Sequence, residues 1–169
     1  MIVAETARLR MRWFDPGDAP FVFDLVNQPS WIQYIGDKGI KTLQDAIRYI
    51  ENGPVAMYQR VGFGLYAVEL KVSGEPIGMC GLIKRDTLPD VDIGFAFLPA
   101  FWRNGYAFEA ATAVMSYRRT TLALDRIVAI LSEGNHRSSH LLEKLGFRFE
   151  RKVTQPPRDA TLLLYASSA

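Results

Sequence analysis

Three extended segments in succession constrain the fold of this 169-residue chain more than any other feature of its sequence. They cover residues 62–71, 76–84 and 90–97, and each has the alternating or apolar character of a β-strand. Turn-forming residues separate them, namely Ser73-Gly74-Glu75 and Asp86-Thr87-Leu88-Pro89. Because short turns between successive strands favour antiparallel pairing, the centre of the chain predicts an antiparallel meander.

Helical and extended segments alternate on both sides of this meander. Helical spacing of apolar residues follows the turn at 15–18 and recurs over 42–51, 104–120 and 133–145. Further strand patterns occupy 8–13, 126–131, 147–153 and 161–165. The order β-α-α-β-β-β-α-β-α-β-β predicts an α+β (mixed α/β) fold with a largely antiparallel central sheet of about seven strands and helices on both faces. We expect residues 1–169 to form one domain.

Local signals support the helix boundaries. Thr42 is a predicted N-cap, and Asp45 three residues later completes a variant capping box. Gly146 has the position of a C′ residue that ends the helix over 133–145. In the helix over 104–120, one face is expected to carry Ala107, Ala110, Ala111, Val114, Met115 and Arg118.

Charge and cysteine content exclude several classes of protein. The net charge is only +2, from 20 basic and 18 acidic residues, which argues against binding to nucleic acid or to a membrane surface. Cys80 is the single cysteine, so neither an internal disulfide nor a thiolate zinc site is expected. Charged residues interrupt the first apolar positions, and no signal peptide is predicted. We expect a cytoplasmic protein that is a monomer or a homodimer.

One segment offers a site for an anion. Pro99 ends an extended run, and Gly105 then stands at the entrance to the helix over 104–120. The first N–H groups of a helix lack intrahelical partners, and a glycine lets a phosphate approach them. Arg103 adds positive charge beside it. The alternative is that Gly105 is an ordinary loop residue before an alanine-rich helix. A G-x-G-x-x-A match at 62–67 leads into a strand, so we do not expect a dinucleotide there.

Several separated motifs, taken together, resemble the GCN5-related N-acetyltransferase (GNAT) family, and in particular its RimJ/RimL-like branch. The resemblance covers nearly the whole chain. Its motifs are Glu5-Thr6-Ala7-Arg8-Leu9, Gly78-Met79-Cys80-Gly81-Leu82-Ile83, Asp92-Ile93-Gly94-Phe95, the run from Trp102 to Ala110, and the run from Asn135 to Phe147, which contains Glu143-Lys144-Leu145-Gly146-Phe147.

The resemblance implies acetyl-CoA as co-substrate, direct transfer of its acetyl group to an amine and no metal. The amine is expected to be a peptide N-terminus or a small molecule. The pyrophosphate is expected on the backbone of Arg103, Asn104, Gly105, Tyr106, Ala107 and Phe108. The pantetheine arm is expected to pair with the backbone of Phe97 and Leu98, where a bulge in relatives separates neighbouring strands. Asn135 is expected to contact the cofactor and Ser138 to lie near the thioester sulfur.

Three positions depart from the family pattern. Trp102 stands where the wider family has Gln or Arg, although the RimJ/RimL-like branch often has Trp there. Arg103 replaces the usual glycine. The tyrosine that many relatives use as general acid is Leu142 here, which puts protonation of the thiolate by a tyrosine in doubt.

The catalytic candidates are two carboxylates and a serine. Asp92 is the first candidate base, because alternation puts small Gly94 and Ala96 on its face and leaves space for a ligand. Glu69 is the second, with a surface charge on an edge strand as the alternative. Ser138 is the candidate general acid or sulfur contact. A backbone N–H of Phe97 or Leu98 could stabilise the oxyanion. Asp92 and Ser138 are equally explicable as ordinary polar residues.

Other residues have structural interpretations. Glu109 is favourable in the first turn of a helix simply because its negative charge lies at the positive end of the helix dipole, and Asn135 suits an N-cap. His136 and His140 lack a third metal ligand, and Cys80 suits buried packing. The segment around Trp31, Tyr34 and Ile35 contributes either to the acceptor pocket or to core packing. The rival to an enzyme is a non-catalytic acyl-CoA-binding regulatory module of the same fold.

Overall fold

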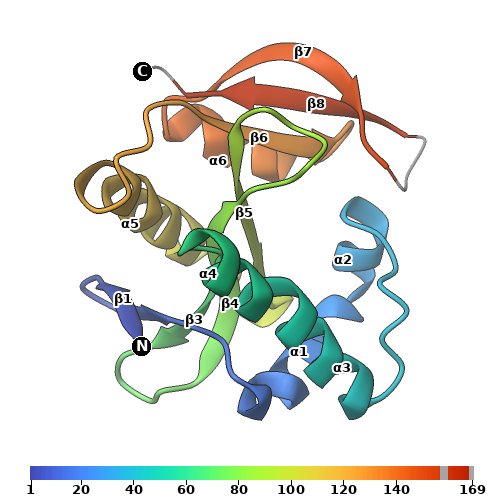
Figure 1. Ribbon diagram of the computed structural model, residues 1–169, viewed down its shortest axis with the longest axis vertical. Coiled ribbons are helices and arrows are strands. Elements are labelled where there is room, and N and C mark those ends of the chain that lie inside the picture. Colours follow the sequence, from blue (N-terminus) through green and yellow to red (C-terminus); the bar gives the residue numbers. More distant parts are fainter. Residues whose placement is uncertain (157–159, 168–169) are drawn as a thin grey trace.

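The computed structural model describes residues 1–156 and 160–167, which form one eight-stranded sheet with helices on both faces (Figure 1). The strand order is β1-β2-β3-β4-β5-β6-β8-β7. Among the described strands, β5 and β6 are the only parallel pair, and every other neighbouring pair is antiparallel. The α+β fold and the meander β3-β4-β5 are confirmed. The strands are β1 (Ile2–Glu5), β2 (Leu9–Arg12), β3 (Leu65–Leu70), β4 (Pro76–Ile83), β5 (Val91–Phe97), β6 (Ile127–Ser132), β7 (Arg148–Thr154) and β8 (Thr161–Ala166).

The helices lie in two groups. α1 and α3, with α2 beside them, pack on one face of the sheet, whereas α5 and α6 pack on the other (Figure 1). α4 contributes Tyr58 to the core on the α5 face, where its ring stacks on Tyr66. No helix in the part of the chain that the structure describes is long and apolar enough to cross a membrane. The helices are α1 (Ala19–Val26), α2 (Pro29–Tyr34), α3 (Leu43–Ile50), α4 (Ala56–Val61), α5 (Tyr106–Thr120) and α6 (His136–Lys144), with a π-helical turn at Glu51–Val55 and 3₁₀ turns at Pro16–Asp18 and Pro99–Phe101.

Each face of the sheet has its own core. The alternation of strand side chains sends Tyr66, Cys80 and Leu82 towards α5, and Ala67 and Met79 towards α1 and α3. On α5 the predicted inner face is confirmed at Ala110, Ala111 and Val114, which are buried, and at Arg118, which is 2% exposed. The small alanines let α5 pack closely on the sheet.

Local capping signals agree with the structure, whereas three short elements escaped prediction. Thr42 Oγ1 accepts from the backbone N–H of Asp45 at 3.0 Å, and Asp45 Oδ2 accepts from the N–H of Thr42 at 3.1 Å, so the capping box is confirmed.

The eighth strand, β1, is a four-residue edge strand, and α2 and α4 have six residues each. Elements this short carry too few periodic residues for a sequence signal.

The feature that prepares the site is a gap in the sheet between β5 and β6. Their pairing consists of Val91 opposite Ile127 and Asp92 opposite Val128, after which the two parallel strands separate. The expected bulge is absent from β5, because its register with β4 is unbroken from Ile83 opposite Asp92 to Gly78 opposite Phe97. The gap therefore arises because the ladder between β5 and β6 stops.

Candidate active site

The edge of β5 that faces this gap offers backbone groups of Phe95 and Phe97. The N–H of Leu98 donates to the carbonyl of Ile77 on β4 at 2.9 Å. Because backbone groups alternate in direction along a strand, those of Phe95 and Phe97 point to the opposite side, towards the gap. The carbonyl of Phe97 accepts from Trp102 Nε1 at 2.9 Å. Phe95 and the N–H of Phe97 are thus the groups offered to a ligand.

The expected role of the Leu98 backbone needs correction. Its N–H is held by Ile77, and its carbonyl accepts from the N–H of Phe101 at 2.9 Å. Neither group is open to an added strand or to an oxyanion. The prediction named Leu98 in place of Phe95, because a sequence does not show towards which neighbouring strand each backbone group points.

The entrance of α5 lies directly after this edge. Gly105 is the N-cap residue with φ +81°, and no side chain caps the first N–H groups of the helix. These donors are therefore available to an anion. Arg103 also has a left-handed backbone, with φ +67°, a conformation that costs a non-glycine residue about 1 kcal/mol. This explains why relatives place glycine at the position of Arg103.

Arg8 is a residue of this region that the sequence interpretation missed. Its Nε donates to Glu109 Oε2 at 2.8 Å, and its guanidinium carbon lies 4.4 Å from the centre of the Tyr106 ring. A Cβ atom added to Gly105 would lie 3.5 Å from Arg8 Nη2. Glu109 therefore anchors the segment before β2 to α5, which agrees with its structural interpretation. The two residues are 101 positions apart, beyond the reach of any local pattern.

The start of α6 lies against the same loop. Asn135 Oδ1 accepts from the N–H of Ser138 at 3.3 Å, so Asn135 is the predicted N-cap. Arg137 lies over Trp102, with its guanidinium carbon 3.9 Å from the ring centre. Ser138 shares a helix face with Leu142, four residues later, which is 1% exposed and packs in the core beneath. Ser138 is thus directed inwards from the helix start.

Asp92 lies where the gap begins. Its side chain is buried, and Arg85 contacts it with Nε at 3.0 Å from Oδ1 and Nη2 at 3.4 Å from Oδ2. Burial raises the pKa of Asp92 to about 6, and the positive charge of Arg85 opposes this shift. The space predicted beside it is partly filled, since a Cβ at Gly94 would lie 3.2 Å from Ile83 Cδ1 and 3.4 Å from Leu65 Cδ2.

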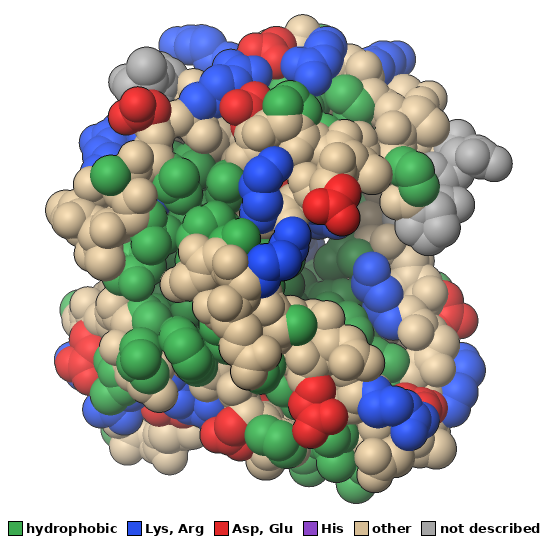
Figure 2. All heavy atoms as spheres, viewed as in Figure 1, with side chains coloured by type: hydrophobic (Ala, Val, Ile, Leu, Met, Phe, Trp, Pro, Cys, Tyr) green, Lys and Arg blue, Asp and Glu red, His purple; other side chains and the backbone are tan. Residues whose placement is uncertain are grey.

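The face of the sheet that carries Asp92 is hollowed. Figure 2 shows a depression between α4 and α2 with apolar side chains inside and Lys or Arg side chains at its rim. A cavity of about 420 Å³ adjoins α3 and is lined by Lys38, Gly39, Ile40, Asp45, Arg48, Tyr49, Asn52 and Gly53. The end of α2 is bonded to β6, because Ser132 Oγ donates to the carbonyl of Tyr34 at 2.7 Å. Trp31 is buried in the core, which confirms the packing interpretation for this residue.

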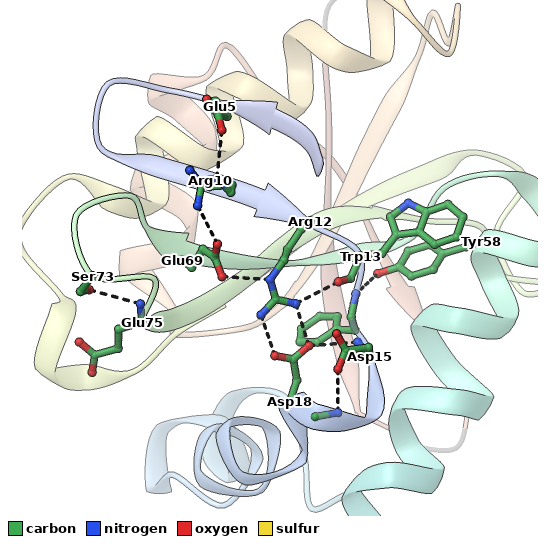
Figure 3. A network of polar contacts seen from close by, with 12 residues as sticks. Glu5, Arg10, Arg12, Trp13, Asp15, Asp18, Tyr58, Glu69, Ser73 and Glu75 are labelled. Atoms are coloured by element: carbon green, nitrogen blue, oxygen red, sulfur yellow. Dashed lines mark hydrogen bonds and ion pairs between the residues drawn. The ribbon is translucent and has the colours of Figure 1, made fainter. Parts of the chain in front are cut away.

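Glu69 belongs to a polar network at another part of the sheet (Figure 3). Its carboxylate accepts from Arg12 Nε at 2.9 Å and from Arg10 Nη1 at 3.3 Å, and the residue is 7% exposed. The interpretation of Glu69 as a surface charge on an edge strand was wrong, because β1 and β2 continue the sheet beyond β3. β4 separates Glu69 from β5, a lateral distance of about 10 Å. Its geometry favours a structural role.

The remaining candidates are Cys80 and the two histidines of α6. Cys80 is buried between sheet and α5, and burial raises the pKa of its thiol, as expected for a packing residue. His136 and His140 are exposed on α6. Among residues 1–156 and 160–167, no three His, Cys, Asp or Glu side chains form a group that could hold a metal ion.

Known proteins share both sequence and architecture with this chain. A family model described as "Acetyltransferase (GNAT) domain" matches residues 8–148. "Uncharacterized N-acetyltransferase YoaA" of Bacillus subtilis is 30% identical over 154 residues, which cover 90% of this chain and 86% of that protein. YnaD of the same organism, also named an N-acetyltransferase, is 28% identical over 86% of this chain and 82% of its own length.

Solved structures repeat the fold. An acetyltransferase from Agrobacterium tumefaciens has a TM-score of 0.83 and 24% identity, with 98% of this chain and 94% of that chain covered. RimL, a ribosomal L7/L12 α-N-protein acetyltransferase solved with coenzyme A, has a TM-score of 0.83 and 18% identity, with 99% and 98% covered. With the gap, the open entrance of α5 and the family match over most of its length, this chain belongs to the GNAT family of acetyltransferases and is an acetyl-CoA-dependent acyltransferase.

Proposed function

We propose that this enzyme transfers the acetyl group of acetyl-CoA directly to a primary amine and belongs to the RimJ/RimL-like branch. The observation that carries the proposal is the gap between β5 and β6, with the starts of α5 and α6 beside its open end. A site entered from one face and hollowed on the other suits two substrates that meet within the sheet.

The cofactor follows the backbone donors that the fold leaves open. The amides from Arg103 to Phe108 receive the diphosphate, where Gly105 permits close approach. The backbone of Phe95 at the edge of β5 would hold the pantetheine arm as it would hold an added strand, which leaves the N–H of Phe97 for the reacting carbonyl. Asn135 contributes its side-chain amide, because its Oδ1 is used as the cap. The thioester supplies the activated acetyl group.

The chain's own residues then manage protons and charge. Asp92 accepts the proton of the acceptor ammonium, directly or through water, and its raised pKa suits a base near neutral pH. The N–H of Phe97 points into the gap and stabilises the oxyanion. The hydroxyl of Ser138 donates a hydrogen bond to the leaving thiolate and relays to it the proton that the attacking nitrogen loses, which Leu142, buried and apolar, cannot do. Cys80, the single cysteine, is buried in the core, which supports direct transfer without a covalent acyl-enzyme.

The acceptor enters from the hollowed face. Two carboxylates of this face are already engaged: Asp92 pairs with Arg85, and the cavity residue Asp45 binds the N–H groups of Lys41 and Thr42 and the side chain of Arg48. Neither is free to bind the additional charges of a polycationic amine, which favours a peptide N-terminus or a small amine. RimL and a ribosomal-protein-S5-alanine acetyltransferase from Vibrio fischeri are structural neighbours with protein acceptors in their names.

Release of free thiol from acetyl-CoA tests the proposal. Peptides with varied N-termini, amino acids, polyamines and aminoglycosides are compared as acceptors. We expect release that depends on a peptide or small amine and is lowest with polyamines. Binding of acetyl-CoA without release under any acceptor supports the non-catalytic acyl-CoA module instead. Acetyl-CoA should also raise the melting temperature, whereas NAD and ATP should not.

A further inference from the structure

The loop before α5 has cations on both sides, and their surroundings differ. Arg8 lies over Tyr106 on one side and is paired with Glu109. Arg137 lies over Trp102 on the α6 side. Within the described ranges 1–156 and 160–167, neither Arg137 nor Arg103 has an ion pair with a carboxylate. The positive charge on the α6 side is therefore uncompensated.

Arg137 is also held in place without donating a hydrogen bond to any of residues 1–156 and 160–167. Its guanidinium lies 3.9 Å from the centre of the Trp102 ring, and the indole is itself fixed by the bond from Nε1 to the Phe97 carbonyl at 2.9 Å. Stacking on a ring engages the face of a guanidinium and leaves the N–H groups at its edge free. Such a fork suits the oxygens of a phosphate.

We propose that Arg137, with Arg103 beside it in the loop, binds the 3′-phosphate of CoA and makes the enzyme select acetyl-CoA over acetyl-3′-dephospho-CoA. The inference rests on the proposed function, since it adds a contact to the same cofactor site. The contact is made by the cofactor's ADP portion, away from the reacting thioester.

Charge decides which phosphate each arginine suits. The 3′-phosphate is a terminal monoester with a charge of about −1.5 to −2 at neutral pH, whereas each phosphate of the diphosphate carries about one charge. A doubly charged group is best matched by guanidinium groups that have no carboxylate partner, as on the α6 side. Arg8 is paired with Glu109 and lies beside Gly105, so it suits the diphosphate, which both forms of the cofactor contain.

Dissociation constants for the two thioesters, measured by calorimetry, test the assignment. Wild type should bind acetyl-CoA about tenfold to a hundredfold more tightly than the dephospho form, as expected for charge-assisted hydrogen bonds. Arg137→Gln should weaken acetyl-CoA binding by about tenfold and leave the dephospho form unchanged. Arg8→Gln should weaken both to the same extent. Arg119→Gln is the matched control, at the other end of α5 and about 21 Å from Gly105.

The outcomes separate this inference from the function on which it rests. Failure of wild type to bind acetyl-CoA overturns the proposed function. Equal binding of the two thioesters by wild type, or an equal loss for both in Arg137→Gln, overturns this inference alone. Lys144 is the competing cation, because it lies on α6 like Arg137 and its Nζ lies over the ring of Phe108 on α5. If Lys144→Gln and not Arg137→Gln abolishes the discrimination, the assignment to Arg137 is wrong.

Discussion

The arginines of this protein occupy two opposite situations. In the network between β2, β3 and α1, Arg12 contacts Asp18 at 2.8 Å and Glu69 at 2.9 Å, and Arg10 contacts Glu69 and Glu5 (Figure 3). At the entrance of α5, Arg137 rests on an aromatic ring, and Arg103 stands exposed in a left-handed backbone conformation. The charges of the network are matched within the protein, whereas Arg137 and Arg103 have no carboxylate partner in the part of the chain that the structure describes.

This difference separates stability from binding. Carboxylates saturate the network and tie the first strands to the helices on one face, so its contribution is to the folded state. The entrance of α5 keeps donors and charges available, at some cost in backbone strain. Asp92 lies between the two cases, because it is buried but has one cationic partner, Arg85. The predictions below are ordered by the size of the expected effect.

Asp92→Asn should lower turnover about a thousandfold, because a general base contributes on that scale. In wild type, kcat/KM should fall as the pH drops below about 6, following the pKa of Asp92, and this limb should vanish in the variant. The pH profile of acetyl transfer measures both. Unchanged turnover would show that Asp92 serves only its pair with Arg85.

The same residue affects stability with a definite sign. The pKa of Asp92 is raised in the folded state from 3.8 to about 6. Its favourable contribution is therefore complete below pH 3.8 and is lost as the pH rises through about 6. Urea unfolding at pH 4 and pH 7 should show a smaller difference in Asp92→Asn than in wild type.

Gly105→Val should weaken acetyl-CoA binding about a hundredfold, because a β-branched residue is strained at φ +81° and covers the amides at the entrance of α5. Gly74→Val is the matched control, with φ +74° in the turn between β3 and β4. It should lose comparable stability but keep its affinity. Calorimetry and thermal melting separate the two effects, and equal affinities in both variants would contradict the diphosphate site.

Glu69→Gln should lower the free energy of unfolding by about 2 kcal/mol, since it leaves Arg10 and Arg12 with one partner fewer in a largely buried network. The KM for acetyl-CoA should not change. Glu75→Gln in the neighbouring turn is the control, with an expected change within about 0.5 kcal/mol. A large loss of turnover with unchanged stability would restore Glu69 as a catalytic candidate.

Ser138→Ala should lower turnover about tenfold and leave the KM for acetyl-CoA nearly unchanged, as for a group that acts on the leaving thiolate. Ser139→Ala provides the comparison on the same helix, because Ser139 Oγ is used in a bond to the His136 carbonyl at 3.0 Å. Steady-state kinetics of both variants test the assignment. Equal rates in the two would remove Ser138 from the chemistry.

Arg103→Gly should have the smallest effect, a gain of about 0.5 kcal/mol in the free energy of unfolding. Glycine relieves the strain of the left-handed backbone, and its greater freedom in the unfolded chain offsets part of this gain. Ala123→Gly is the control, because Ala123 also has positive φ, at +52°. Both variants should gain stability, but only Arg103→Gly should lose affinity for acetyl-CoA. Denaturant unfolding and calorimetry measure the pair.

Much of the fold followed from local patterns. The turns at 73–75 and 86–89 predicted the meander, and Thr42 with Asp45 predicted a capping box that the structure contains. The position of Gly105 at a helix entrance was also predicted correctly. These features depend on residues within a few positions of one another, where backbone preferences act directly.

The site was harder to predict where it depends on distant partners. Arg8 with Glu109, and Arg137 with Trp102, join segments that no periodicity relates. The N–H of Leu98 bonds to β4, and the ladder between β5 and β6 ends after two residue pairs. Both features likewise depend on which strands lie next to each other. A strand pattern gives the spacing of side chains but not the identity of the strand on each side.

The sequence by itself determined the order of the elements, their caps and the glycine at the entrance of α5, because these follow from torsional preference and local hydrogen bonding. Only the tertiary structure decided which charges are neutralised. It buried Asp92 beside Arg85, enclosed Glu69 between two arginines and left Arg137 on an aromatic ring. Burial and ion pairing depend on what surrounds a side chain in space, and that is set when the sheet assembles.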